Sequence, residues 1–476
     1  MKRLISLVLG IAVLIGVFVA CGQTNTSDFT IRIDGMGNFG YPTPFASVPR
    51  GPSFIRASMT HDTLLWKGKD GLIPWLATSY EKTASGYIFH LRNDVKWADE
   101  VPFTADDVVF SYNYYKQHPP KGFIWGAFYM VKSVSKIDDH TVKIVPVKDT
   151  PEFLDLAVST VFILPKHIWE HVDNPYTYTK KDAFIGTGPF ILEKYDSTTG
   201  LYVYKPKKDW WGGTIPYTVE FVNSSSPVGD AAAGKLDMVY LWGSDIYSAK
   251  KVLGKGFLTK RGESYLMYFL IFNTEKLPVY VRKALASVID RQSIVDKVAH
   301  GYGNVPDLID VQIGKDEAQN ILKDIKTLQM VTSPKFETIA LAIKDQLKKA
   351  GVDVNVKMLP MGASDEAIRK GEFDIAVIAH GGLAYGPAWV NITWPYQGYH
   401  SQKWNVVAEK LKFYSPDELK ENIKAVLSEE VPVLPIYTPD VMLFQKGDLP
   451  VEFFFTPRGI GAGIPIPVNK VIFIRK

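Results

Sequence analysis

The sequence has only one cysteine, Cys21, among its 476 residues. A disulfide within the chain is therefore excluded, and so is a zinc or iron–sulfur site built from several cysteines. The sequence also lacks an excess of one charge, because 54 Lys and Arg stand against 50 Asp and Glu, a net charge of +4. Nucleic-acid binders usually carry a clustered basic excess, so we exclude that class and expect no nucleic-acid partner.

Long apolar runs are scarce as well. With 46% hydrophobic and 22% charged residues, the composition is that of a soluble globular protein rather than of a multi-span membrane protein. One run stands out at the N-terminus, where the 17 residues Leu4–Ala20 carry no charge and follow the basic pair Lys2 and Arg3. A basic start followed by an apolar stretch is typical of an export signal.

The end of this run, Phe18-Val19-Ala20-Cys21, resembles a bacterial lipobox, in which the cysteine is lipidated and becomes the mature N-terminus. This resemblance implies a signal peptide over 1–20, lipid attachment at Cys21 and a small, polar tether over 21–28. An uncleaved signal anchor remains an alternative, since 17 apolar residues lie at the lower limit for spanning a bilayer. In both cases the protein is held at the membrane outside the cytoplasm.

The length permits two to four domains at roughly 100 to 200 residues each. No period of about 20 to 50 residues repeats, which excludes solenoids and propellers. In the first half, residues 87–92 and 140–146 alternate like strands, and Thr104-Ala-Asp-Asp107 is a variant of the capping box that starts a helix. The first half is therefore predicted to be α+β.

A different pattern begins at about residue 263. Residues 326–331, 352–358 and 373–379 read as strands, and the apolar spacing from Phe336 to Leu347 predicts a helix that Gly351 ends. Such a β-α-β-α-β series predicts parallel strands with right-handed crossovers. Ligands of these sheets bind beyond the carboxyl ends of the strands, which here indicates His380-Gly381-Gly382.

Two helix and strand predictions complete this part of the chain. Ser415–Glu418 should cap a helix whose inner face carries Leu419, Ile423, Val426 and Leu427, and Val471–Ile474 is predicted to be a strand. Because the two halves are built differently and are of comparable size, we expect two lobes with a cleft between them.

Short motifs follow one another in order along residues 29–450. They are Phe89–Trp97 with Val101–Val108, Leu164–Trp169, Gly186–Phe190, Asp209–Gly213, Phe272–Thr274 with Val281–Ala286 and Ile289–Arg291, and Glu429–Pro435. The sequence thereby resembles the extracellular solute-binding proteins of ABC importers, the family that includes dipeptide, oligopeptide and nickel-chelate binders.

The resemblance implies an α/β fold class: a two-lobed clamp, like the periplasmic binding proteins, with a hinge and an interlobe cleft. The larger, α+β lobe would comprise residues 29–265 and a C-terminal return over 444–476, and the smaller lobe residues 266–443. It also implies a monomer that is not an enzyme, needs no cofactor and delivers its solute to ABC permease subunits. Closure of the lobes over the solute would supply the signal that the importer reads.

Four residues are the candidates for ligand contact. Trp125 and Tyr385 resemble the aromatic residues that nickel-chelate relatives bring from the two lobes. Trp389 lies in an aromatic-rich loop that could stack on a solute, and His380 could pair with a metal or a carboxylate. For Trp125→Ala we expect binding to weaken by more than about tenfold and the melting temperature of the unliganded protein to stay almost unchanged.

Three ligand classes remain open. Peptide-binding relatives hold the peptide amino terminus with an Asp, but Ala384 stands at that position. Nickel-chelate relatives use a second Trp and an Arg, where this chain has Gly381 and an arginine-free stretch, Leu156–Ile163. We favour a peptide-like solute, and a metal chelate and an oligosaccharide are the alternatives.

An alternative of another class is a secreted zinc hydrolase. His167-Ile-Trp-Glu170-His171 has the spacing of inverted zinc peptidases, but no third ligand is identifiable and we assign neither a catalytic nor a metal site. Gly459–Gly463 lacks the strand-to-helix setting of a phosphate-binding loop and is predicted to be a turn.

Overall fold

A seven-stranded mixed sheet organises the larger part of the molecule. The structure is a computed structural model that describes residues 29–475, so the predicted signal, lipid-attachment and tether segments lie outside the described residues. In sheet order the strands are β12 (Phe257–Gly262), β19 (Val441–Lys446), β11 (Met238–Trp242), β1 (Phe29–Asp34), β10 (Tyr217–Val222), β9 (Leu201–Pro206) and β8 (Phe190–Asp196). Strand β19 comes from near the C-terminus and pairs antiparallel with both β11 and β12.

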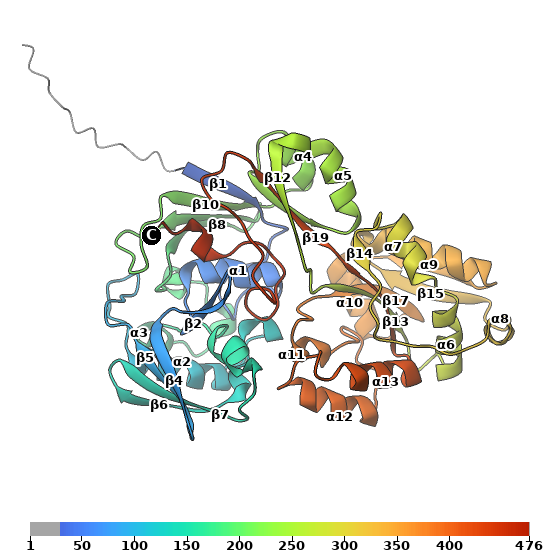
Figure 1. Ribbon diagram of the computed structural model, residues 1–476, viewed down its shortest axis with the longest axis horizontal. Helices are drawn as coiled ribbons and strands as arrows, with labels where there is room; N and C mark the ends of the chain where they lie inside the picture. Colours follow the sequence, from blue (N-terminus) through green and yellow to red (C-terminus); the bar gives the residue numbers. More distant parts are fainter. Residues whose placement is uncertain (1–28, 476) are drawn as a thin grey trace, which may run out of the picture.

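Smaller sheets and helices surround this sheet (Figure 1). The four-stranded sheet consists of β4 (Ala77–Thr83), β5 (Gly86–Leu91), β7 (Thr141–Pro146) and β6 (Val131–Asp138), and β2 (Leu65–Gly68) pairs with β3 (Gly71–Pro74). The accompanying helices are α1 (Gly51–Thr60), α2 (Ala105–Gln117), α3 (Lys166–Trp169), α4 (Pro227–Ala232) and α5 (Ser244–Leu253). The predicted capping box is confirmed, since the Thr104 side chain accepts a hydrogen bond at the start of α2 and Asp107 accepts one from the Thr104 N–H.

A six-stranded sheet organises the second part of the molecule. Its order is β14 (Gly303–Asn304), β18 (Val433–Pro439), β13 (Met267–Phe272), β17 (Ile375–His380), β15 (Thr327–Thr332) and β16 (Asp353–Met358). The predicted β-α-β-α-β series is confirmed, because β15 is parallel to both β16 and β17. The helices are α6 (Val279–Ser287), α7 (Arg291–Lys297), α8 (Lys315–Leu322), α9 (Glu337–Lys349), α10 (Met361–Arg369), α11 (Gly386–Trp389), α12 (Gln402–Leu411) and α13 (Lys420–Glu430).

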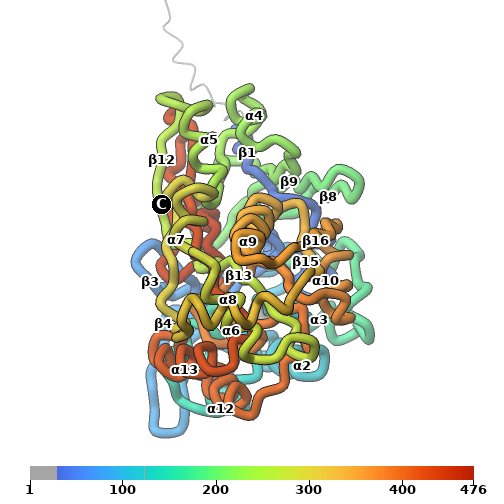
Figure 2. Tube along the Cα trace, turned by 90° about the vertical axis from the view of Figure 1, so that its right-hand side faces the viewer, coloured from blue at the N-terminus to red at the C-terminus, as the bar shows by residue number. Residues whose placement is uncertain are grey.

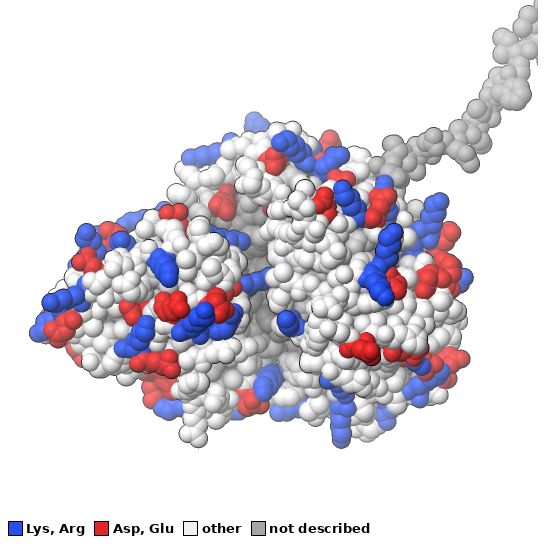
Figure 3. Space-filling model, turned by 180° about the vertical axis from the view of Figure 1, so that it is seen from behind, with Lys and Arg blue, Asp and Glu red and all other residues white. Residues whose placement is uncertain are grey.

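Each large sheet has its own hydrophobic core. The core of the six-stranded sheet contains only residues between Met267 and Tyr437, whereas the main core of the seven-stranded sheet runs from Ile31 to Tyr240, includes Tyr385 and resumes at Leu443. We call residues 29–262 and 441–475 lobe I and residues 267–439 lobe II. Figure 2 views the molecule from the side of lobe II, where α6, α8 and α9 lie on the surface. A groove separates the two lobes in the space-filling view (Figure 3).

The chain crosses between the lobes twice, from β12 to β13 and from β18 to β19. Because β19 starts at Val441, the return to the first sheet begins before residue 444, where the sequence placed it. The glycine-rich motif Gly186–Phe190 is needed for packing within lobe I. A Cβ on Gly186 would lie 1.8 Å from the carbonyl oxygen of Thr60, so a side chain cannot be accommodated there.

The prediction of a strand over Val471–Ile474 is wrong. Residues Lys470–Phe473 form a short 3-10 helix, in which the Asn469 side chain accepts a hydrogen bond from the Val471 N–H. Lys470 is fully buried and forms an ion pair with Asp62, which is also fully buried. Alternating apolar residues predict a strand, but this buried ion pair and the cap fix a helical turn instead.

Among residues 29–475, no helix combines the length and the apolar character that crossing a bilayer would require.

Candidate functional site

Tyr385 is the side chain that joins the two lobes most closely. It follows β17 and precedes α11 in lobe II, yet it is fully buried within the core of lobe I. Its hydroxyl donates a hydrogen bond to Asp155 Oδ2 at 2.5 Å and accepts one from Lys67 Nζ at 2.6 Å. A polar side chain of one lobe is thus enclosed by charged groups of the other.

Two cations of lobe I flank the Tyr385 ring. Lys67 ends in a buried ammonium that also donates to the Gly461 carbonyl at 2.9 Å. The Arg458 guanidinium lies 4.3 Å from the centre of the Tyr385 ring and donates to the Ala384 carbonyl at 3.1 Å. Cations over an aromatic face are attracted by its quadrupole, so the pair supports Tyr385 in this position.

Two carboxylates complete this cluster. Asp155 lies 3.7 Å from Lys67 Nζ and 3.7 Å from Arg458 Nη1, and Glu152 Oε1 accepts a hydrogen bond from Arg458 at 3.3 Å. The other oxygen of Glu152, Oε2, is buried without a hydrogen-bond partner among the described residues. We call Lys67, Glu152, Asp155, Tyr385 and Arg458 the interlobe cluster.

Local backbone structure brings these groups together. Asp155 lies on a π-helical turn, Leu154–Val158, and such turns occur often at functional sites. Arg458 adopts a φ of +56°, a conformation that costs a non-glycine residue roughly 1–3 kcal/mol. Strain of this kind persists only where the surroundings impose it, here through the bonds of Arg458 to Glu152 and Ala384.

Burial changes the acidity of the cluster. It lowers the pKa of Lys67 to about 8, although the charge of Asp155 opposes this shift. Burial, with a further contribution from Asp155, raises the pKa of the Tyr385 phenol. It also raises the pKa of Glu152, although Arg458 opposes that change. Burial therefore disfavours the charged forms of Lys67 and Glu152, although Lys67 is paired with Asp155 and Glu152 with Arg458.

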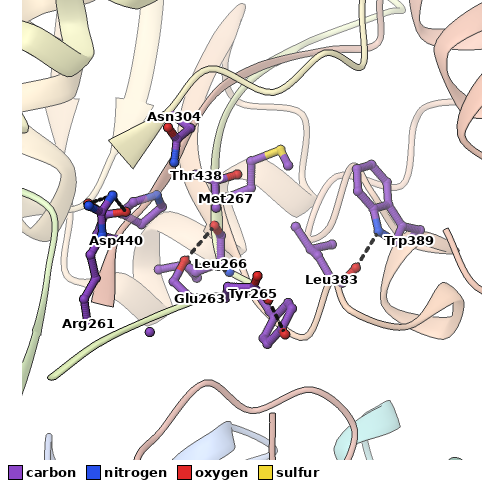
Figure 4. Close-up of a pocket in the computed structure, with 13 residues that line it drawn as sticks. Arg261, Glu263, Tyr265, Leu266, Met267, Asn304, Leu383, Trp389, Thr438 and Asp440 are labelled. Carbon is purple, nitrogen blue, oxygen red and sulfur yellow. Dashed lines mark hydrogen bonds and ion pairs between the residues drawn. The ribbon is translucent and has the colours of Figure 1, made fainter. Parts of the chain in front are cut away.

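A pocket of about 560 Å³ lies beside the two crossings of the chain. Figure 4 shows Arg261 and Asp440 on one side of it and Leu383 with Trp389 on the other. Tyr265 connects the pocket to the interlobe cluster, because its carbonyl accepts a hydrogen bond from the Leu383 N–H and its hydroxyl accepts one from the Arg458 N–H. The volume falls within the range of about 300–1,000 Å³ for small-molecule sites.

The loops around Tyr385 also pack backbone against backbone. A Cβ on Gly463 of lobe I would lie 3.0 Å from the carbonyl oxygen of Gly382 in lobe II. Elsewhere on the groove, Arg50 forms an ion pair with Asp365 at 3.3 Å and lies over the Trp394 ring at 4.7 Å. The lobes are therefore in direct contact at more than one place.

The structure brings some of the predicted site residues together. Tyr385 lies in the interlobe cluster, and Trp389 lines the adjacent pocket, where its Nε1 donates to the Leu383 carbonyl at 3.1 Å. His380 ends β17 as expected, and its Nδ1 lies 3.1 Å from the Gly381 carbonyl. Burial lowers the pKa of His380 to about 4, so its ring is neutral near pH 7.

Trp125 is buried in the core of lobe I, with its ring centroid 6.2 Å from that of Phe54. Its Nε1 has no hydrogen-bond partner among the described residues. Whether Trp125 touches a ligand remains a prediction, but its burial contradicts the expectation that Trp125→Ala leaves the stability of the unliganded protein unchanged.

The zinc-peptidase spacing does not form a metal site. Helix α3 ends at Trp169, so the two histidines do not share one helical face. His167 pairs with Asp99 at 2.8 Å, and His171 is exposed. Within residues 29–475, no group of three or more His, Cys, Asp or Glu side chains is placed to hold a metal ion.

Sequence reasoning missed Lys67, Glu152, Asp155 and Arg458. They lie far apart in the chain, so no local spacing connects them. One signal was present: Lys67 directly follows Leu64-Leu65-Trp66, and Glu152 and Asp155 interrupt an apolar stretch that continues to Leu164. A charge placed among buried apolar residues usually has a partner or a function.

Comparison with known proteins places these features in a family. A family model of the bacterial extracellular solute-binding proteins, family 5, matches residues 71–324. The dipeptide-binding protein of Escherichia coli (strain K12) is 32% identical over 266 residues, which cover 50% of this chain and 49% of that protein. The chain therefore spans about half the length of this relative.

Two further proteins match most of the chain. The oligopeptide-binding protein AppA of Bacillus subtilis (strain 168) is 27% identical over 439 residues, covering 77% of this chain and 78% of that protein. The crystal structure of NikZ from Campylobacter jejuni in complex with Ni(L-His) superimposes with a TM-score of 0.76 at 22% identity, covering 91% of this chain and 97% of that one. At this identity the structural match establishes the two-lobed fold.

Proposed function

Because this chain belongs to the bacterial extracellular solute-binding proteins of family 5, we propose that it is a lipid-anchored receptor that binds a peptide-like small solute between its lobes and delivers it to an ABC permease. The family consists of solute-binding proteins and not of enzymes, so the solute is released chemically unchanged.

The observation that carries this proposal is the burial of Tyr385 of lobe II among charged groups of lobe I. A side chain can be enclosed in this way only when the lobes are shut. Closing two lobes over a solute excludes water and strengthens every polar contact inside, and a ligand that binds the shut form better shifts the equilibrium toward it. The permease would then distinguish the loaded from the empty receptor by shape.

The chemistry of the site supports a peptide-like solute. The interlobe cluster and the adjacent pocket offer cations, carboxylates and amide groups from both lobes, including Lys67, Arg458, Arg261, Glu263 and Asn304. A peptide presents an ammonium, a carboxylate and amide groups, all of which need such partners in a buried site. Two relatives whose names state dipeptide and oligopeptide binding support the same class.

A metal chelate is the second candidate, and Arg458 favours it. Chelators such as histidine carry carboxylates, and Arg458 lies over the Tyr385 ring, where it could hold one. It would take the role of the arginine that Leu156–Ile163 lacks. An oligosaccharide gains no support, because Tyr396 and Trp404 of the aromatic-rich loop are buried in the core of lobe II.

The cellular setting is part of the proposal. Export by the segment 1–20 and lipid attachment at Cys21 would hold the receptor in the periplasm or at the outer face of the cytoplasmic membrane. Lobe I, residues 29–262 with 441–475, and lobe II, residues 267–439, would move as the two halves of the clamp. Replacement of Cys21 by alanine should release the protein from membranes, and a protein that stays bound would favour the uncleaved anchor.

The deciding experiment identifies the solute. The protein is purified under native conditions and denatured, and the released material is analysed by mass spectrometry and metal analysis. We expect an intact peptide or a related amino compound in amounts close to that of the protein. Stoichiometric nickel or another transition metal would support the chelate receptor instead. A solute that the protein alone converts to a product would contradict the proposal.

A further inference from the structure

Glu152 is the one member of the interlobe cluster with an unused hydrogen-bonding atom at the contact between the lobes. Its side chain is 4% exposed, and only Oε1 has a partner, the guanidinium of Arg458. Oε2 is buried and accepts no hydrogen bond from any other described residue, and the backbone N–H that acts on the carboxyl group is that of Glu152 itself. Buried carboxylate oxygens are normally satisfied, so this atom indicates a missing donor.

The charges around Glu152 indicate a missing cation. Arg458 divides its contacts between Glu152 at 3.3 Å, Asp155 at 3.7 Å and the Ala384 carbonyl at 3.1 Å. Lys67 faces Asp155 and Tyr385, and none of its contacts reaches Glu152. Burial raises the pKa of Glu152 in spite of Arg458, and the carboxylate of Glu418 in lobe II adds to that rise. A second donor with positive charge would stabilise the ionised form of Glu152.

The four charged side chains of the interlobe cluster balance one another, since Glu152 and Asp155 stand against Lys67 and Arg458, and Glu418 of lobe II adds a negative charge beyond the cluster. A ligand with only a positive charge would disturb this balance in a buried place, and so would one with only a negative charge. A ligand that carries both an ammonium and a carboxylate keeps it. Arg458 is the cation with room to receive the carboxylate, because its side chain is 40% exposed whereas that of Lys67 is 3% exposed.

Building on the proposed function, we propose that the solute carries a primary ammonium group, as an amino acid or an unblocked peptide does, and that Glu152 of lobe I binds it through Oε2. Asp155 is the second carboxylate near the ammonium. From lobe II, the Tyr385 side chain and the Ala384 carbonyl contact the charged groups of this cluster, and neither of them carries a negative charge. The acid that recognises the amine therefore comes from lobe I.

The test compares unblocked and N-acetylated peptides. The full-length protein is stripped of its co-purified solute, and calorimetry measures its affinity for a panel of di- to pentapeptides and their N-acetylated forms. We expect N-acetylation to weaken binding by at least tenfold. Because this comparison uses the unaltered protein, it does not depend on the folding of a variant.

Two variants then assign the effect to one side chain. Glu152→Gln keeps the shape of the side chain and removes its charge. It should weaken the binding of unblocked peptides at least tenfold, whereas N-acetylated peptides should bind to it with the same affinity as to the wild type. The matched control is Glu220→Gln, which removes another lobe I glutamate paired with an arginine, Arg32 at 3.4 Å, and should leave both affinities unchanged.

The outcomes separate the two proposals. If acetylated and unblocked peptides bind the wild type equally well, or if Glu152→Gln binds unblocked peptides as tightly as the wild type does, the role of Glu152 is wrong and the peptide receptor stands. If no peptide of the panel binds the wild type, the peptide-like solute and the role of Glu152 are both overturned.

Discussion

The Tyr385 hydroxyl both accepts and donates a hydrogen bond, and both of its partners are charged. Hydrogen bonds to charged groups are worth about 1.5–3 kcal/mol, more than those between neutral groups. Phenylalanine would fill the same space but would leave a buried ammonium and a carboxylate without this bridge. The phenol, rather than the ring alone, is what makes this position specific.

Trp125→Ala should lower the free energy of unfolding by about 3–5 kcal/mol, because it removes a fully buried indole from the core of lobe I. Denaturant unfolding of the solute-free protein measures this loss. Trp125→Phe serves as the control, since it keeps most of the buried ring and should recover a large part of the stability. An unfolding midpoint of the alanine variant equal to that of the wild type would contradict the packing.

His380→Gln should make the protein less sensitive to acid. Burial lowers the pKa of His380 to about 4, below its unfolded value of 6.5, so between pH 6.5 and pH 4 the unfolded state binds the additional proton. The wild type therefore loses stability as the pH falls through this window. The variant should lose less, by on the order of 2 kcal/mol.

Unfolding free energies at several pH values between 6.5 and 4 measure this difference. His171→Gln is the matched control, because the His171 ring is exposed at the surface and its removal should not change the pH profile. Parallel profiles for the wild type and His380→Gln would contradict the lowered pKa of His380.

Among single residues, the sequence indicated two near the end of β17 and missed the charged members of the interlobe cluster. His380 was proposed because it ends a strand whose carboxyl end predicts ligand contact, and Tyr385 because it lies in the loop after that strand and resembles an aromatic residue of nickel-chelate relatives. Lys67 and Arg458 were missed because their contacts are with residues far away in the sequence. Long-range ion pairs have no period that a sequence pattern could reveal.

At the scale of elements, the contact of Gly463 with Gly382 determines how closely the lobes approach. Gly463→Ala would place a Cβ 3.0 Å from the Gly382 carbonyl, at a φ of +84° that is itself unfavourable for alanine. We expect both a loss of folding stability of about 1–2 kcal/mol from the backbone and a roughly tenfold weaker affinity for the solute, because full closure is prevented.

The control for Gly463→Ala is Gly351→Ala, at a φ of +89° with no atom within 4 Å of the added Cβ. Both variants carry the same backbone cost, so any difference in affinity arises from the contact between the lobes. Calorimetry with the solute identified by mass spectrometry gives the two affinities. Equal values would mean that this contact does not limit closure.

Elements with local signals were predicted well. The box at Thr104 caps α2 as expected. At Ser415 the box also forms, because Glu418 accepts a hydrogen bond from the Ser415 N–H, but it does not cap the helix, since α13 begins only at Lys420 with Leu419 at its N-cap position. The inner face predicted for the second helix is confirmed, since Ile423 and Leu427 are fully buried. Residues 471–474 were assigned wrongly, because a tertiary ion pair decided their conformation.

On the scale of the whole molecule, Tyr385→Phe should shift the receptor toward an open form. The variant loses the two charged hydrogen bonds that fasten lobe II to lobe I, so small-angle scattering of the solute-free protein should give a larger radius of gyration than for the wild type. Affinity for the solute should fall by roughly tenfold, which corresponds to about 1.4 kcal/mol.

Tyr396→Phe provides the comparison, since the Tyr396 hydroxyl donates to Asn273 Oδ1 within lobe II. Its loss should affect the stability of that lobe and leave the radius of gyration as in the wild type. If Tyr385→Phe and the wild type scatter identically and bind the solute equally well, the interlobe cluster does not hold the clamp shut.

The two-lobed architecture was predictable at this scale because it depends on many motifs in order rather than on one residue. The family motifs lie mainly at scaffold positions such as Gly186, whose neighbour Thr60 leaves no space for a side chain. A scaffold position such as Gly186 serves the packing of lobe I, so these motifs indicate the two-lobed fold and do not identify the solute. We expect the choice of solute to depend on the interlobe cluster, whose residues come together only in the folded chain.

The burial of Lys470 against Asp62 has a consequence for biosynthesis. Lobe II is one uninterrupted stretch, residues 267–439, and can fold as a unit before the rest of the chain is complete. Lobe I is synthesised first but cannot complete its folding until after lobe II has been synthesised, because β19 and Lys470 follow lobe II in the sequence. A chain that ended before Lys470 would thus have a complete lobe II, but it would leave the buried Asp62 of lobe I without its cation.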